Sequence, residues 1–119
     1  MALRSFALVL CLAPLAVATG AKADVTQGRA LYIKVGCYQC HGTEGQGGVA
    51  GPRLAPAPMA WEAFAQYVHN TTDAMPPYRE SVLPGTELKL IHDFLLSIPP
   101  PPNVDDIPLL RALKKRPAP

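Results

Sequence analysis

Apolar side chains recur at the spacing of one helix face in three separate segments of this chain, and stretches rich in glycine and proline separate these segments. The first segment has apolar positions at i, i+3, i+4 and i+7, occupied by Gly28, Leu31, Tyr32 and Val35. Asp24 lies ahead of them and can cap a helix with its carboxylate. We therefore expect a helix that begins at Asp24 and leads into Cys37.

The same spacing predicts two further helices. One of them carries the apolar residues Trp61, Phe64, Ala65 and Val68. Asn70 stands where a residue in the left-handed conformation could end that helix. The other helix has Thr86 as its expected cap, stops at Pro99, and carries the apolar residues Leu88, Ile91, Leu95 and Ile98.

Two long connections lie between these helices. Residues 42–58 contain five glycines and three prolines, a composition that excludes regular structure. Residues 71–84 are polar and interrupted by proline, and they contain the run Met75-Pro76-Pro77-Tyr78. The pattern predicts an all-α fold of about three helices with long loops, which need an apolar group to wrap around.

The start of the chain differs from this middle part. Arg4, an apolar run over residues 6–18 and small residues ending at Ala21-Lys22-Ala23 are typical of a secretory signal peptide. The apolar run holds 13 residues, whereas a helix needs about 20 to span a bilayer. We expect cleavage after Ala23, which removes residues 1–23 and leaves no membrane span.

The end of the chain also differs. Residues 99–119 begin with four consecutive prolines and predict an extended, disordered tail after a folded domain of residues 24–98. The tail is expected to be a solvated linker, and a docking arm for a partner is the alternative. A docking arm could form a short amphipathic turn on binding, with the apolar residues Ile107, Leu109, Leu110 and Leu113.

The balance of charge argues against nucleic acid as a partner. After the predicted leader, residues 24–119 hold 9 basic and 9 acidic side chains. Residues 24–98 hold 5 basic and 7 acidic side chains, so the expected folded domain is mildly acidic.

The run Cys37-Tyr38-Gln39-Cys40-His41 holds the reactive groups of this chain. Two thiols three positions apart lie within one helical turn and can form thioethers with the two vinyl groups of one porphyrin. His41 follows directly, and a neutral imidazole is a good axial ligand when its other ring nitrogen donates to a carbonyl. Cys11 leaves with the predicted leader, so Cys37 and Cys40 remain. The spacing therefore predicts one covalently attached haem c.

Two other interpretations of these residues stay open. A CxxC pair can be a thioredoxin-like redox couple, but that interpretation expects a βαβ context and leaves His41 unexplained. A zinc site would need a fourth ligand, which His69 or His92 could supply. Covalent haem agrees with export, because thioethers form on reduced thiols that meet haem outside the cytoplasm. The expected location is therefore the periplasm.

From Gly28 to Ile98 the arrangement resembles the class I cytochromes c, which are small mono-haem electron carriers. Besides the haem run, Gly51-Pro52-Arg53-Leu54 resembles the family's loop after the attachment site, and Met75-Pro76 resembles the segment that holds its distal ligand. The resemblance implies a small cytochrome c-like fold wrapped around one haem.

The resemblance also implies roles for single residues. His41 would lie on one face of the haem and Met75 on the other, with the Pro52 carbonyl accepting a hydrogen bond from the histidine ring. Gly28 would lie where the first and last helices cross, against Phe94.

The chemistry of a thioether supports Met75 independently, because this soft ligand prefers ferrous iron and raises the reduction potential of haem. Met59 is its rival, and His69, His92 or an open site are the other possibilities.

Donors are also needed for the haem propionates, and the candidates are Arg53, Trp61, Tyr67 and Arg79.

These residues predict an electron-transfer protein rather than an enzyme, with a dehydrogenase as donor and an oxidase or cytochrome as acceptor. Two alternatives stay open: a cytochrome subunit of a multi-subunit dehydrogenase, and a haem enzyme or gas sensor with an open sixth position. The family's usual ring of lysines is missing, since Lys34 and Lys89 are the only lysines in residues 24–98. Recognition of partners is therefore expected to depend on apolar contacts or on the tail.

Overall fold

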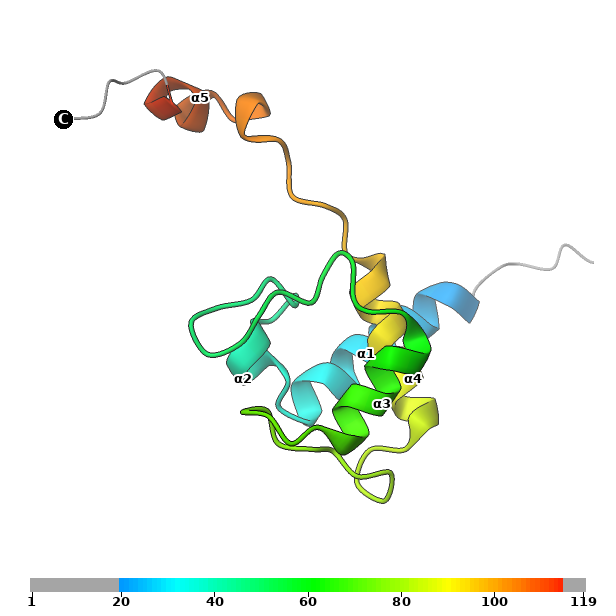
Figure 1. Cartoon of the computed structure of the whole chain (residues 1–119). Coiled ribbons are helices and arrows are strands. Elements are labelled where there is room, and N and C mark those ends of the chain that lie inside the picture. Colours follow the sequence, from blue (N-terminus) through cyan, green and yellow to red (C-terminus); the bar gives the residue numbers. More distant parts are fainter. Residues whose placement is uncertain (1–19, 115–119) are drawn as a thin grey trace, which may run out of the picture.

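The computed structural model describes residues 20–114, and all regular structure in this range is helical (Figure 1). The elements are α1 (Gly20–Lys34), α2 (Tyr38–His41), α3 (Trp61–Asn70), α4 (Gly85–Ser97), the 3₁₀ turn η1 (Val104–Asp106) and α5 (Pro108–Lys114). The all-α prediction is confirmed. The three expected helices correspond to α1, α3 and α4, and the short helices α2 and α5 are additional to them.

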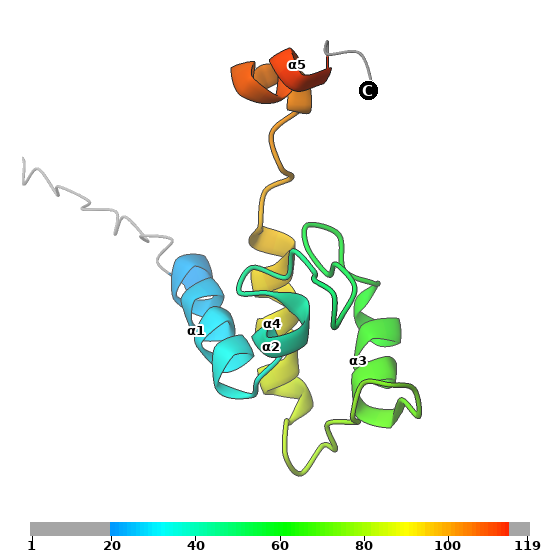
Figure 2. The ribbon, with the colours of Figure 1, turned by 90° about the vertical axis from the view of Figure 1, so that its left-hand side faces the viewer.

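Helices α1 and α4 pack closely against each other and carry α3 on the other flank of α4 (Figure 2). The crossing of α1 and α4 depends on Gly28. A Cβ atom at this position would lie 2.1 Å from the carbonyl oxygen of Leu90 and 3.0 Å from the Cβ of Phe94. Gly28 therefore faces Phe94 as expected, and the backbone of Leu90 is its nearest neighbour.

The three predicted apolar stripes form one core. Its members come from all three helices, from the loop ahead of α4 and, through Ala55, from the loop ahead of α3, and the most deeply buried are Tyr32, Leu83, Leu88, Ile91, Phe94 and Leu95. The rings of Tyr32 and Phe94 lie 5.5 Å apart between centroids, which joins α1 to α4. Both Val35 and Ile98, at the ends of their stripes, are half-buried against this core.

The predicted helix ends need correction at three residues. Asp24 is not a cap, because α1 already begins at Gly20, in a run of good helix formers that includes Ala21, Lys22 and Ala23. Thr86 lies inside α4, since Pro84 occupies the N-cap and its carbonyl accepts from the backbone N–H of Leu88. Asn70 is the last helical residue of α3 rather than a left-handed terminator, and its side-chain amide donates to the Gln66 carbonyl.

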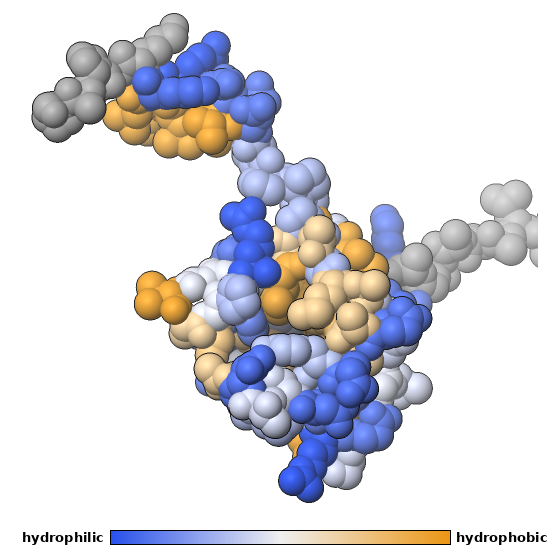
Figure 3. Space-filling model, viewed as in Figure 1, coloured by the Kyte–Doolittle hydropathy of each residue, from blue (hydrophilic) through white to orange (hydrophobic). Residues whose placement is uncertain are grey.

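The described part of the predicted tail contains two short helical elements, and the expected disorder of the tail stays a prediction. The four prolines are extended, but η1 and α5 follow them, and Figure 1 shows both standing away from the helices of the core. Lys114 pairs with Asp105 at 3.2 Å, and Asn103 caps η1 by accepting from the Asp105 N–H. These local bonds hold the turn without help from the core, and Figure 3 shows the apolar side chains of α5 gathered on one side.

The predicted leader lies mostly outside the described residues, and so does Cys11. The predicted cleavage point after Ala23 falls within α1, and cleavage there stays a prediction. Among residues 20–114, none of the helices combines the length and the apolar character needed to cross a bilayer.

Candidate cofactor site

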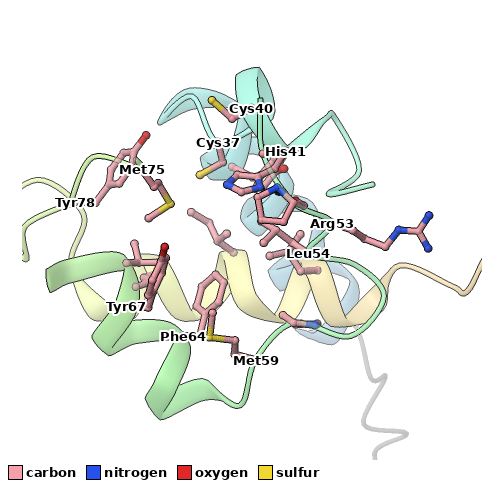
Figure 4. A pocket seen from close by; sticks show the side chains of 18 of the residues that line it. Cys37, Cys40, His41, Arg53, Leu54, Met59, Phe64, Tyr67, Met75 and Tyr78 are labelled. Atoms are coloured by element: carbon pink, nitrogen blue, oxygen red, sulfur yellow. Dashed lines mark hydrogen bonds between the residues drawn. The ribbon is translucent and has the colours of Figure 1, made fainter. Parts of the chain in front are cut away.

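A cavity of about 470 Å³ opens between α2, α3 and the two long loops (Figure 4). Its volume falls in the range of small-molecule and cofactor sites, roughly 300–1,000 Å³. Several side chains of the core also form its walls, namely Tyr32, Phe64, Val68, Leu88, Ile91 and Leu95. The cavity is therefore lined mainly by apolar groups and lies at the centre of the fold.

The two thiols lie at the rim of this cavity. Cys37 occupies the N-cap of α2 and Cys40 lies within the same turn, and both are free cysteines that line the cavity. Cys37 is half-buried and Cys40 is exposed. Burial raises the pKa of the Cys37 thiol to about 11, so this group is protonated at neutral pH. A thioredoxin-like redox couple needs a thiol of lowered pKa, and Cys37 has the opposite shift.

His41 presents one ring nitrogen to the cavity, because the other is already bonded. The ring is buried, and Nδ1 lies 2.8 Å from the Pro52 carbonyl oxygen. A carbonyl can only accept, so Nδ1 carries the proton and the lone pair belongs to Nε2. The expected hydrogen bond between His41 and Pro52 is thus present. Gly51 packs against the same ring, where a Cβ would lie 3.0 Å from Nδ1.

Met75 and His41 belong to different walls of the cavity. Figure 4 shows the Met75 side chain coming from the loop between α3 and α4, and His41 from α2 on the other side. Met75 is half-buried, whereas its rival Met59 is 48% exposed at the entry to α3, although it also lines the cavity. The structure therefore brings Cys37, Cys40, His41 and Met75 around one space.

The two alternative histidine ligands do not line the cavity. His92 is buried, and its Nε2 lies 2.9 Å from the Met59 carbonyl. The ring of His69 is directed to the Tyr78 carbonyl through Nδ1. Within the range 20–114, three or more His, Cys, Asp or Glu side chains do not gather at any point where they could hold a metal ion. The zinc interpretation therefore lacks its fourth ligand in this part of the chain.

The four candidate donors to the haem propionates do not all lie at the cavity. Arg53 and Tyr67 line the cavity, whereas Trp61 and Arg79 do not. Trp61 instead packs edge-on against His92, with 5.7 Å between ring centroids. Asp73 also lines the cavity and accepts from the Tyr67 hydroxyl at 3.0 Å, a contact that no sequence pattern indicated.

Two tyrosines at the cavity make hydrogen bonds that the sequence patterns did not indicate. The hydroxyl of Tyr32 donates to the Gly42 carbonyl at 2.7 Å, and the hydroxyl of Tyr78 donates to the Val35 carbonyl at 3.0 Å. Burial raises the pKa of both side chains, so both remain donors at neutral pH. Helical spacing marks Tyr32 as a core residue, but no local signal shows which distant carbonyl a tyrosine reaches.

The residues around the cavity fit a covalently held porphyrin. They supply two free thiols within one turn, an imidazole with a fixed tautomer, a thioether on another wall, and apolar sides for a macrocycle. A helical fold built around such a site defines a class I cytochrome c. Residues 23–95 match the family model described as cytochrome c oxidase, cbb3-type, subunit III, and the chain belongs to this family. Neither a curated protein nor a solved structure gives a significant match to the chain.

The family match confirms the expected resemblance to the class I cytochromes c. It also supports the coarser part of the functional prediction, which is that the chain carries haem c and transfers electrons.

Proposed function

We propose that this protein is an exported mono-haem cytochrome c in which His41 and Met75 would ligate the haem iron. The observation that carries the proposal is the placement of His41 and Met75 on two walls of one apolar cavity, with Cys37 and Cys40 at its rim. The haem supplies one-electron chemistry between ferric and ferrous iron when it is bound through the two cysteines.

The protein's own contribution is to hold the ligand set constant. The Pro52 carbonyl fixes the tautomer and the orientation of the His41 ring, and the loop holds Met75 between two elements of the core. Apolar side chains on the walls exclude water from the space between these ligands. A site with little rearrangement between redox states is suited to electron transfer, and two protein ligands leave no open position for a substrate.

We further propose that partner proteins are recognised through apolar contacts near the cavity mouth. The folded part has few lysines, and the exposed apolar side chains include Met59 at the cavity, with Val49 and Val82 on the loops.

The electron donor is proposed to be a dehydrogenase and the electron acceptor an oxidase or another cytochrome. The family's description names an oxidase subunit, which favours a permanent complex as the second candidate. Co-purification of the exported protein with a larger oxidoreductase would distinguish this candidate from a free carrier.

The decisive measurement is mass spectrometry of the protein purified from the periplasm of a host that matures c-type cytochromes. We expect loss of the first 23 residues and a gain of one haem mass that survives denaturation. Cys37→Ser and Cys40→Ser each leave one thioether and shift the spectrum of the reduced protein. A colourless product with two unmodified thiols would contradict the proposal.

A further inference from the structure

Tyr78 connects its own loop, between α3 and α4, to the ends of α1 and α3. Its backbone N–H donates to the Val68 carbonyl in α3 at 2.8 Å, and its hydroxyl donates to the Val35 carbonyl, just after α1, at 3.0 Å. Its carbonyl accepts from Nδ1 of His69. A single residue of the loop is thereby bonded to the ends of both α1 and α3.

The hydroxyl bond of Tyr78 joins the two sides of the site, which are the haem motif and the loop that carries Met75. Val35 precedes Cys37 by two residues, so the hydroxyl bond reaches the segment that begins the haem motif. Met75 precedes Tyr78 by three residues in the same loop, and both residues line the cavity. The Tyr78 side chain therefore links the segment just ahead of the haem motif to the loop that carries Met75.

His69 holds the other side of Tyr78. Its ring is mostly buried, with 14% of the side chain exposed, and its Nε2 lies 3.0 Å from Oε2 of Glu80. The second oxygen of Glu80 accepts from the backbone N–H of Gly85 at 2.8 Å, at the start of α4. His69 thus bonds the end of α3 to the loop through Nδ1, while its Nε2 makes no hydrogen bond, and Glu80 of the same loop bonds the first residue of α4.

We propose that Tyr78 and His69 are positioning residues that hold Met75 at its distance from His41 and so determine how readily an external ligand displaces Met75. This inference rests on the proposed His41 and Met75 ligation. The two prolines between Met75 and Tyr78 restrict the backbone, so a displacement of Tyr78 is transmitted to Met75 rather than absorbed by the chain.

The test is an imidazole titration of the ferric, haem-loaded protein, followed by the sulfur-to-iron absorbance band. Tyr78→Phe removes the hydroxyl bond to Val35 and keeps the ring and both backbone bonds. We expect its imidazole affinity to rise about fivefold, the factor that corresponds to the loss of one ordinary hydrogen bond. The matched control is Ser97→Ala, because it also removes one hydroxyl-to-carbonyl bond, 2.7 Å to Phe94, but lies outside the cavity lining, and its affinity should stay at the native value.

His69 is tested with two variants. His69→Leu removes the bond to the Tyr78 carbonyl and is expected to raise imidazole affinity in the same way as Tyr78→Phe. His69→Asn retains a donor near the position of Nδ1 and should restore most of the native affinity, which a general loss of packing would not allow.

Three results would overturn the proposal in distinguishable ways. Native protein without the sulfur-to-iron band would remove Met75 as a ligand, and the inference would fail together with the proposed ligation. A native band with unchanged affinity in Tyr78→Phe and His69→Leu would overturn the positioning role alone. An equal rise in Ser97→Ala would show that the effect is not specific to the bond between Tyr78 and Val35.

Discussion

His41 and Met75 differ in how firmly this structure fixes them. His41 is buried, its Nδ1 lies 2.8 Å from the Pro52 carbonyl oxygen, and the backbone of Gly51 lies too close to its ring to leave room for a Cβ, so its orientation is fixed. Met75 has no polar anchor of its own and depends on its loop. A thioether needs no hydrogen bond of its own, so the position of Met75 is decided by its packing and by the bonds that hold its loop at Tyr78.

The first prediction concerns Met75. Replacement by alanine should abolish the sulfur-to-iron band, lower the reduction potential by on the order of 100 mV, and let cyanide or carbon monoxide bind rapidly. The measurements are the ferric spectrum and a redox titration. Met59→Ala is the matched control, since Met59 also lines the cavity, and it should keep both the band and the potential. Loss of the band in the Met59 variant alone would reassign the ligand.

At the scale of the elements, the crossing of α1 and α4 brings the haem motif over the core. Cys37 lies three residues after α1 ends at Lys34, and Leu88, Ile91 and Leu95 of α4 form part of the cavity wall. This crossing therefore places the haem motif beside the wall of the cavity that α4 provides.

The second prediction follows from this crossing. Gly28→Ala places a methyl group 2.1 Å from the Leu90 carbonyl oxygen, which forces the helices apart. The overlap should outweigh the ~1 kcal/mol by which alanine favours a helix over glycine, and lower the free energy of unfolding by about 1–3 kcal/mol. Denaturant unfolding of the haem-loaded protein measures the loss.

Gly48→Ala is the control for this prediction. A Cβ at Gly48 would lie 3.7 Å from its nearest neighbour, the Cys40 carbonyl oxygen, so the free energy of unfolding should change by no more than ~0.5 kcal/mol. Equal stability of the Gly28 and Gly48 variants would show that the crossing tolerates a side chain.

At the scale of the whole molecule, the hydrophobic core and the walls of the cofactor cavity share side chains. The same side chains that α1, α3 and α4 bury against each other also form the cavity walls. A folded domain of fewer than 100 residues has little other apolar surface to bury, so the group in the cavity is expected to contribute much of its stability.

The third prediction is therefore that the chain folds poorly without haem. Protein made without haem attachment, for example the double variant Cys37→Ser and Cys40→Ser, should show a weaker helical circular dichroism signal and a broad, weakly cooperative thermal transition. The haem-loaded protein measured under the same conditions is the reference. A full helical signal with a sharp transition in the unligated chain would count against this role of haem.

The fourth prediction concerns the tail. A chain that ends at Pro102 lacks η1 and α5, which bond to each other and stand away from the core, so the spectrum and the unfolding midpoint should be unchanged. Keeping Pro99 and Pro101 preserves the small hollow that they line together with Ala55 and Pro56. A marked fall in the unfolding midpoint would mean that the last helix contributes to the core in solution.

The sequence determined those features that depend on neighbours along the chain. Periodicity located the three apolar stripes, and the close spacing of Cys37, Cys40 and His41 predicted haem c, which the family match supports. Local patterns located the helix ends less well. Asp24, Thr86 and Asn70 are residue types that can cap a helix, but each of them also fits inside one. Alanine and lysine ahead of Asp24, and Pro84 ahead of Thr86, decided the actual starts.

Only the tertiary structure decided which candidates share one space. Arg53 and Tyr67 reach the cavity while Trp61 and Arg79 do not, and Tyr78 bonds to Val35, which is 43 positions away in the chain. Local patterns follow from short-range sterics and from the pitch of a helix, so they can be found in the sequence. Contacts across a cavity follow from how distant elements pack, and that packing depends on the whole set of buried side chains at once.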